Sequence, residues 1–151
     1  MTDPDALRPH ELAVTVPDSF DAQLWFIGRI HTPWTRRGDC PHRGDPENGP
    51  DCRIEVFDPW VPGLTGIAQH EQVQVLYWMD RSRRDLVLQN PRFSDESTGT
   101  FALRSPVRPN PVASSVVRLL GVEGRWLTVR GLDCLSGTPL LDLKAAFGAL
   151  A

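Results

Sequence analysis

Residues 99–120 read GTFALRSPVRPNPVASSVVRLL, and the rest of the chain can be understood around them. Three prolines alternate with Arg104 and Arg108, and a β-branched run follows at once. Because proline fixes φ and lacks an N–H donor, the first half of this stretch is incompatible with a helix or a central strand. We therefore expect a stiff, extended loop that leads into a buried strand. Its arginines either bind a ligand with little loss of entropy or are simply solvated.

The composition is that of a globular domain with a real core, because the chain has 151 residues of which 40% are apolar. No apolar run reaches the roughly 18 residues of a membrane span, and the N-terminus lacks a signal pattern. We therefore expect a cytoplasmic protein without a membrane partner. The net charge of -3 argues against a strongly basic nucleic-acid binder, although it is compatible with a local positive face. Cys40, Cys52 and Cys134 form no CxxC pair, which fits a reducing compartment.

Composition also predicts one domain boundary. Residues 1–20 mix prolines and acids with few large apolar groups, so we expect a flexible N-terminal tail with one short strand near Val14. The barrel domain proper is expected over 21–151. It begins with LWFIGRIHTPW at 24–34, where aromatic and β-branched residues predict a strand that ends in a turn.

Residues 35–51, TRRGDCPHRGDPENGPD, predict a long loop of a kind that is usually functional or disordered in compact domains. Cys40, His42 and Cys52 raise the question of a zinc site. Structural zinc normally takes four ligands in short paired spacings, whereas this loop offers three with an uneven gap. We therefore expect no metal, and we prefer a mobile lid that carries His42 and Arg43 over a ligand.

Alternating apolar residues predict further strands at 52–57, at 71–80 and on both sides of a hairpin turn at Glu123-Gly124. A second polar turn, Ser136 to Pro139, comes before the last apolar run. Together with the proline loop it suggests one ligand site built from two rigid loops. The expected fold is all-β and mainly antiparallel, a small closed or partly open β-barrel with long loops.

A basic tract lies between these strands, DRSRRDLVLQNPR at 80–92, with arginines at 81, 83, 84 and 92. A solvated basic face is the commoner meaning of such a run. Contact with nucleic-acid phosphates is the functional alternative, and the sequence leaves both open.

Five segments resemble the TsaA-like β-barrel family in the family's own order: IGRIHTPW, GLTGIAQH, VLYWMDRSRRD, GTFALRSPVRPNP and GLDCLSGTPLLDLK. They extend over about residues 25–144, and the RSPxRPNP element followed by GTPxLD is long and specific. Characterised members are S-adenosylmethionine-dependent tRNA methyltransferases. They modify the exocyclic nitrogen of threonylcarbamoyladenosine next to the anticodon. The resemblance therefore implies an antiparallel barrel, this cofactor, a tRNA substrate, and a homodimer that binds the cofactor near the subunit boundary.

The resemblance also assigns cofactor-binding residues. The family's lid motif, usually Pro-Arg-Gln, corresponds to Pro41, His42 and Arg43, so two of its three residues differ here. The other assigned residues are Asp80 and Arg81 after a strand, Arg104 in the proline loop, Ser114 on the next strand, and Ser136, Gly137, Thr138 and Pro139 in the closing turn. No residue is identified as the catalytic base.

Two further inferences concern chemistry. Arg104 is expected to pair with the cofactor carboxylate, and the backbone of the Gly137 turn is expected to contact its adenine or ribose. Asp133 and Asp142 either accept hydrogen bonds from hydroxyl groups or stabilise the turn, while His31 and His70 are candidate bases or structural histidines.

Two classes of function remain open at this point. The first is the tRNA-modifying methyltransferase. The second is a non-catalytic protein that keeps the S-adenosylmethionine pocket as a sensor or structural element. Longer members of the family carry an extra C-terminal domain that helps hold tRNA, whereas this chain ends soon after Lys144. A catalyst acting on RNA needs phosphate contacts, whereas a sensor does not. Whether the arginines of 80–92 contact RNA phosphates therefore discriminates between the two classes of function.

Overall fold

The computed structural model describes residues 6–147, which form two compact units. The barrel unit contains residues 24–78 and 114–147, and the insert unit contains residues 6–23 and 79–113. The unit boundaries therefore follow residues 23, 78 and 113, whereas composition suggested one boundary at residue 20. The division into a tail over 1–20 and a domain over 21–151 stays a prediction. Residues 1–5 and 148–151 of that division lie outside the described residues.

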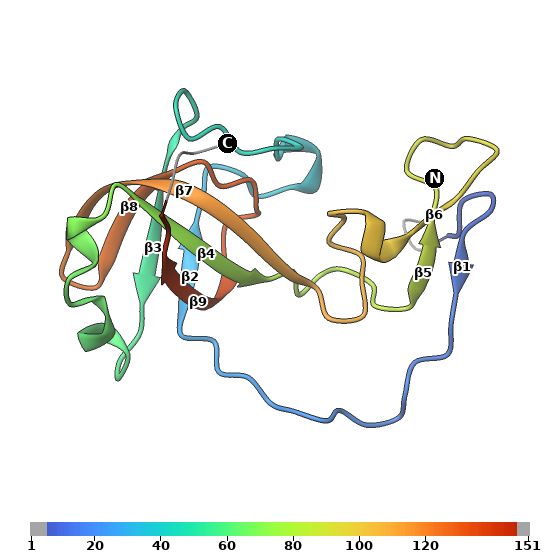
Figure 1. Ribbon diagram of the computed structural model, residues 1–151, viewed down its shortest axis with the longest axis horizontal. Coiled ribbons are helices and arrows are strands. Elements are labelled where there is room, and N and C mark those ends of the chain that lie inside the picture. Colours follow the sequence, from blue (N-terminus) through green and yellow to red (C-terminus); the bar gives the residue numbers. More distant parts are fainter. Residues whose placement is uncertain (1–5, 148–151) are drawn as a thin grey trace. The chain divides into compact units, whose positions relative to one another are not determined.

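Six strands of the chain form a closed barrel in the order β2-β3-β8-β7-β4-β9 (Figure 1). They are β2 (Gly28–His31), β3 (Asp51–Val56), β4 (Gln72–Trp78), β7 (Val112–Glu123), β8 (Trp126–Arg130) and β9 (Thr138–Ala145). Strand β2 pairs antiparallel with both β3 and β9, which closes the sheet on itself. The expected all-β, mainly antiparallel barrel with long loops is confirmed.

Alternation of side chains along the strands produces the barrel core. In β3, Cys52, Ile54 and Val56 are buried, whereas the alternate residues Asp51 and Arg53 are exposed. The core also contains fully buried side chains from the other barrel strands, namely Ile30, Val73, Val75, Val117, Leu127, Val129 and Leu140. Burial of one such side chain stabilises the fold by about 1.5–3 kcal/mol. If one strand shifted by one residue relative to its neighbour, all of its apolar side chains would face solvent. The alternation therefore fixes the register of strand pairing.

The antiparallel order gives the barrel two chemically different ends. At one end, here called the lid end, β2 leads into the loop 32–50, β8 leads into the segment 131–137, and β4 leaves the barrel for the insert unit. At the opposite end, here called the hairpin end, the β7–β8 turn lies with residues 57–71 and the last residues of β9. Residues 57–71 contain two 3-10 helices, η2 (Val61–Leu64) and η3 (Ile67–Gln69). The hairpin expected at Glu123-Gly124 is also confirmed.

The insert unit contains a small sheet of order β1-β5-β6. Its strands are β1 (Leu12–Ala13), β5 (Leu86–Gln89) and β6 (Thr98–Gly99), and the 3-10 helix η4 (Thr100–Ala102) follows. The short strand expected near Val14 is thus present one residue earlier. Residues 103–111 form no helix or strand, so the expectation of an irregular proline loop is confirmed.

Candidate functional site

The closing turn of the sequence, Ser136 to Pro139, is fastened to the end of β2 at the lid end. The Gly137 N–H donates to the Ile30 carbonyl at 2.7 Å, and the Ser136 N–H donates to the Trp34 carbonyl at 2.7 Å. The Thr32 N–H in turn donates to Ser136 Oγ at 3.2 Å. These bonds hold the turn rigidly against the residues that begin the lid loop.

Gly137 gives this turn an open backbone surface. Its φ is +92°, in the left-handed region that favours glycine, and a Cβ built on it would meet nothing within 4 Å. Within the same turn, Thr138 Oγ1 donates to the Leu135 carbonyl at 2.7 Å and so points inward. A ligand can therefore approach the backbone at Gly137 closely, as the resemblance requires of a cofactor-binding turn.

The lid loop is packed on the segment that follows β8. A Cβ on Gly44 would lie 1.8 Å from the Gly131 carbonyl oxygen, so only glycine fits this crossing. Asp45 Oδ1 accepts the N–H groups of Glu47 and Asn48, each at 3.0 Å, and these bonds lower the pKa of the Asp45 carboxyl. The half-buried Pro41 and the exposed His42 and Arg43 come directly before this anchor. The 3-10 helix η1 (Arg37–Asp39) precedes them.

A buried polar cluster joins three strands or segments at the lid end. The Tyr77 hydroxyl is 2.9 Å from Asp133 Oδ1 and 2.8 Å from Ser115 Oγ, and Tyr77 is only 2% exposed. Burial, followed by the charge of Asp133, raises the pKa of Tyr77 far above its usual value, so the phenol stays protonated. Because a carboxylate only accepts, Tyr77 donates to Asp133 and Ser115 donates to Tyr77. This cluster fixes one oxygen of Asp133 while its side chain remains partly accessible.

None of the three cysteines forms a disulfide, and their thiols at the lid end are unreactive. Burial raises the pKa of Cys134 to about 12 and that of Cys52 to about 11. Burial and the charge of Asp133 also raise the pKa of Cys40. Thiols of this kind stay protonated at neutral pH and are poor nucleophiles. Within residues 6–147, no three His, Cys, Asp or Glu side chains are grouped so that they could hold a metal ion.

Ser114, at the lid end of β7, faces the outside of the barrel. Gln74 Nε2 donates to Ser114 Oγ at 2.9 Å, and both side chains alternate with the inward-facing Tyr77 and Ser115. The barrel unit thus brings the lid motif, Ser114 and the closing turn to one end of one barrel. Their role in binding a cofactor stays a prediction.

The remaining assigned residues, Asp80, Arg81 and Arg104, belong to the insert unit. Asp80 and Arg81 follow β4 almost directly along the chain, and Arg104 lies in the proline loop. Their assignment to the cofactor also stays a prediction.

Arginines of the insert unit mainly hold that unit together. Arg83 forms an ion pair with Asp85 at 2.7 Å, and this pair lowers the pKa of the Asp85 carboxyl. Arg84 Nε donates to the Pro109 carbonyl at 2.6 Å, and Arg108 Nη1 donates to the Ser105 carbonyl at 2.9 Å. Arg84 thus connects the basic tract to the proline loop, and contact of the tract with nucleic-acid phosphates stays a prediction.

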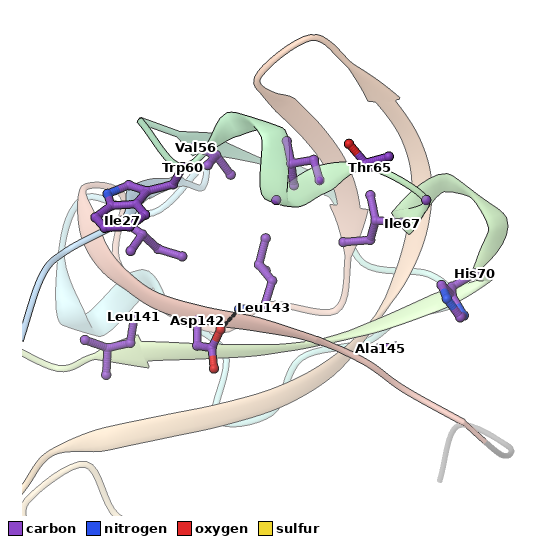
Figure 2. Close-up of a pocket in the computed structure, with 13 residues that line it drawn as sticks. Ile27, Val56, Trp60, Thr65, Ile67, His70, Leu141, Asp142, Leu143 and Ala145 are labelled. Carbon is purple, nitrogen blue, oxygen red and sulfur yellow. Dashed lines mark hydrogen bonds between the residues drawn. The ribbon is translucent and has the colours of Figure 1, made fainter. Parts of the chain in front are cut away.

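The barrel unit also has a pocket of about 620 Å³ at the hairpin end, which the sequence did not indicate. Figure 2 shows it between η2–η3 and β9, with Trp60 toward one side and His70 toward the other. Its lining is mostly apolar, including Ile27, Leu141 and Leu143. His70 lies at this end of the barrel, whereas the closing turn lies at the lid end. The two interpretations of His70, a catalytic base or a structural histidine, stay predictions.

Across the described residues, the structure contains no helix that is both long and apolar enough to span a bilayer.

The fold and the lid end define a class of small antiparallel barrels with an open glycine turn and an anchored loop at one end. The family model described as the tRNA-methyltransferase O N-terminal domain matches residues 29–149, and the chain belongs to this family. The family resemblance stated from the sequence is thereby confirmed.

Individual relatives agree with this membership. The chain is 48% identical over 138 residues to the probable S-adenosyl-L-methionine-binding protein VirR of Rhizobium radiobacter, with 91% of this chain and 78% of the relative covered. It is 38% identical over 97 residues to the putative S-adenosylmethionine-dependent methyltransferase RcsF of Pseudomonas aeruginosa, with 60% and 42% covered. The crystal structure of TrmO from Pseudomonas aeruginosa matches with a TM-score of 0.69 and 28% identity, over 85% of this chain. The match spans 57% of that longer chain.

Proposed function

We propose that the protein is an S-adenosylmethionine-dependent methyltransferase. Its substrate would be the exocyclic nitrogen of threonylcarbamoyladenosine next to the anticodon of tRNA. The observation that carries the proposal is the lid end, where the closing turn and the lid loop are both fixed to the barrel. Membership of the tRNA-methyltransferase O family and the names of the relatives support the choice of cofactor and reaction.

The residues of the lid end fit such a cofactor. The open backbone at Gly137 suits close approach by an adenine or ribose, and the exposed Arg43 carries a charge that pairs with a carboxylate. S-adenosylmethionine supplies a methyl group on a sulfonium. This chain's residues would mainly bind and orient, because alignment of two reactants supplies much of the rate of such a transfer. Asp133, whose Oδ1 is held by the Tyr77 hydroxyl and whose side chain is partly accessible, is our candidate to accept a proton from a nitrogen substrate.

Apolar exposure in the barrel unit supports a homodimer. Leu24, Trp25 and Phe26 are 59%, 76% and 47% exposed, and Trp25 packs against Trp60 with ring centroids 5.4 Å apart. A contiguous exposed apolar patch of this kind is typical of an interaction surface. We expect a twofold dimer. We also expect a cytoplasmic location, where the proposed tRNA substrate would be found.

A specific observation also favours a second function, a non-catalytic S-adenosylmethionine-binding protein. VirR is named for binding this molecule and not for transferring a methyl group. The altered lid motif at His42 and Arg43 is compatible with such a role.

The test uses the purified protein with S-adenosylmethionine and with tRNA that contains threonylcarbamoyladenosine. Calorimetry should show binding, and Arg43→Ala should weaken it about ten-fold through loss of a charge-assisted contact. The fully exposed Arg36, changed to Ala in the same loop, is the matched control and should bind as the parent does. Mass spectrometry of the nucleosides should then show threonylcarbamoyladenosine heavier by one methyl group. Binding without methylation would select the second function, and absence of binding would refute both.

A further inference from the structure

The outer face of β2, β3 and β8 carries an aromatic and cationic cluster, here called the Trp126 face. The Arg53 guanidinium lies 4.0 Å from the centroid of the Trp126 ring. The His31 ring is 5.4 Å from the same ring, tilted by 48°. Arg29 is exposed on the same face, where it lies opposite Glu55 in the register of β2 and β3.

The register of the strands explains why these side chains share one face. His31 pairs with Arg53, and Glu55 pairs with both Arg29 and Trp126. The residues between them, including Ile30 and Leu127, are fully buried in the barrel. Because side chains alternate along a strand, the polar set must point outward.

The charges of this face are less compensated than those elsewhere on the barrel. Arg118, Arg125 and Arg130 each form an ion pair with a carboxylate, at 3.3, 3.0 and 2.6 Å. Arg29 and Arg53 form none with any residue of 6–147.

The single carboxylate among these side chains faces the histidine. Glu55 Oε1 is 3.5 Å from His31 Nε2, which is buried and has no hydrogen-bond partner among the described residues. The Trp126 face therefore has a net positive charge on a protein whose total charge is -3.

The Trp126 face also continues directly into the lid end. His31 is the last residue of β2, and the next residue, Thr32, bonds to the closing turn through Ser136 Oγ. Thr32 Oγ1 further donates to the Cys134 carbonyl at 2.7 Å. A polymer that runs along this face would therefore arrive at the turn that the proposed function assigns to the cofactor.

We propose that the Trp126 face binds the single-stranded loop of the RNA substrate, with phosphates paired to Arg29 and Arg53 and an unstacked base against the Arg53–Trp126 pair. This inference rests on the proposed function. Proteins recognise single-stranded RNA by stacking bases on aromatic rings and guanidinium planes and by pairing cations with the backbone. An acidic protein partner would use the two arginines but would not need an aromatic ring stacked on one of them, which is why RNA is favoured.

The experiment measures binding of a fluorescent anticodon stem–loop RNA by anisotropy at several salt concentrations. The double variant Arg29→Gln, Arg53→Gln should bind about ten-fold more weakly. Its plot of log affinity against log salt should be shallower by roughly 1.4, because two phosphate contacts at about 0.7 each are lost. Trp126→Ala should weaken binding by roughly 5- to 150-fold through lost stacking, and Trp126→Phe should restore most of it. The matched control, Arg118→Gln with Arg125→Gln, removes two paired charges and should leave affinity and slope nearly unchanged.

Cofactor affinity, measured on every variant by calorimetry, separates this inference from the proposed function. If the parent binds RNA and the Arg29, Arg53 variant keeps its affinity and slope, the Trp126 face is not the RNA surface, while the proposed function stands. An equal loss of RNA affinity in the control variant would also overturn the inference. The loss would then result from the lower total positive charge and not from contacts of Arg29 and Arg53. If the parent binds the cofactor but no RNA, the proposed tRNA substrate and this inference are both refuted.

Discussion

Gly44→Ala is the substitution that tests the lid end most directly. The Cβ of an alanine here would lie 1.8 Å from the Gly131 carbonyl oxygen, and real Cβ atoms essentially never lie closer than 3.0 Å to such an atom. The lid loop must therefore move away from the barrel by about 1.2 Å at this point. Such overpacking costs about 1–3 kcal/mol of stability. For a chain of this size, the melting temperature should decrease by roughly 2–4 °C per kcal/mol.

The displaced loop carries Pro41 to Arg43 directly before the crossing. On the proposed function, a displacement of about 1 Å in a positioning loop lowers methyl transfer on the order of 100-fold. Scanning calorimetry measures the stability change, and transfer of a labelled methyl group to tRNA measures the activity change.

Gly38→Ala is the matched control for this experiment, because it is the same substitution in the same loop and its Cβ would meet nothing within 4 Å. It should leave both melting temperature and activity close to those of the parent. Equal effects of the two substitutions, or a Gly44→Ala protein that melts and reacts like the parent, would show that the crossing does not position the loop.

Three other predictions concern the Tyr77 hydroxyl, Arg84 and the three cysteines. Tyr77→Phe should lower the free energy of unfolding by about 1–2 kcal/mol in urea, because its two polar partners lose their bonds, and unchanged stability would mean that water replaces the hydroxyl fully. Arg84→Gln should speed hydrogen exchange in the proline loop and leave the salt dependence of RNA binding unchanged, whereas a shallower slope would make Arg84 a phosphate contact. At pH 7, an alkylating reagent should modify Cys40 before Cys52 and Cys134, since the last two are 1% exposed and their pKa values are raised to about 11 and 12. Peptide mass spectrometry shows the order in which the cysteines are alkylated, and early labelling of Cys134 would contradict its burial.

The strands of the barrel were predictable because a half-buried strand has a period of two. In β3, the buried Cys52, Ile54 and Val56 produce this pattern by themselves, and the Glu123-Gly124 turn marks the hairpin. The small sheet of the insert unit was not predictable in the same way. A short strand was expected near Val14, but the pairing of Leu12 in β1 with Leu88 in β5 is a contact that no local pattern can indicate.

The candidate site was predictable where turn chemistry determines it and not where it depends on long-range contacts. Gly137 in a polar turn signals an open backbone, and the structure has one. Tyr77 and Asp133 are 56 residues apart, and Tyr77 lies in an apolar strand, so nothing in either segment indicates the other. Likewise, a histidine beside a strand does not indicate which end of a barrel it occupies, and the sequence alone did not place His70 at the hairpin end.

The position of β9 in the barrel has a consequence for biosynthesis. This strand pairs on one side with β2 and on the other with β4, yet it is the last of the six barrel strands to be synthesised. Until it emerges, β2 and β4 each present an unpaired edge, and such edges are templates for aggregation. Closing the barrel between Gly28 and Leu140 also requires a contact between distant parts of the chain, which slows folding. The nascent barrel should therefore stay open, and prone to misassembly at these edges, until β9 has left the ribosome.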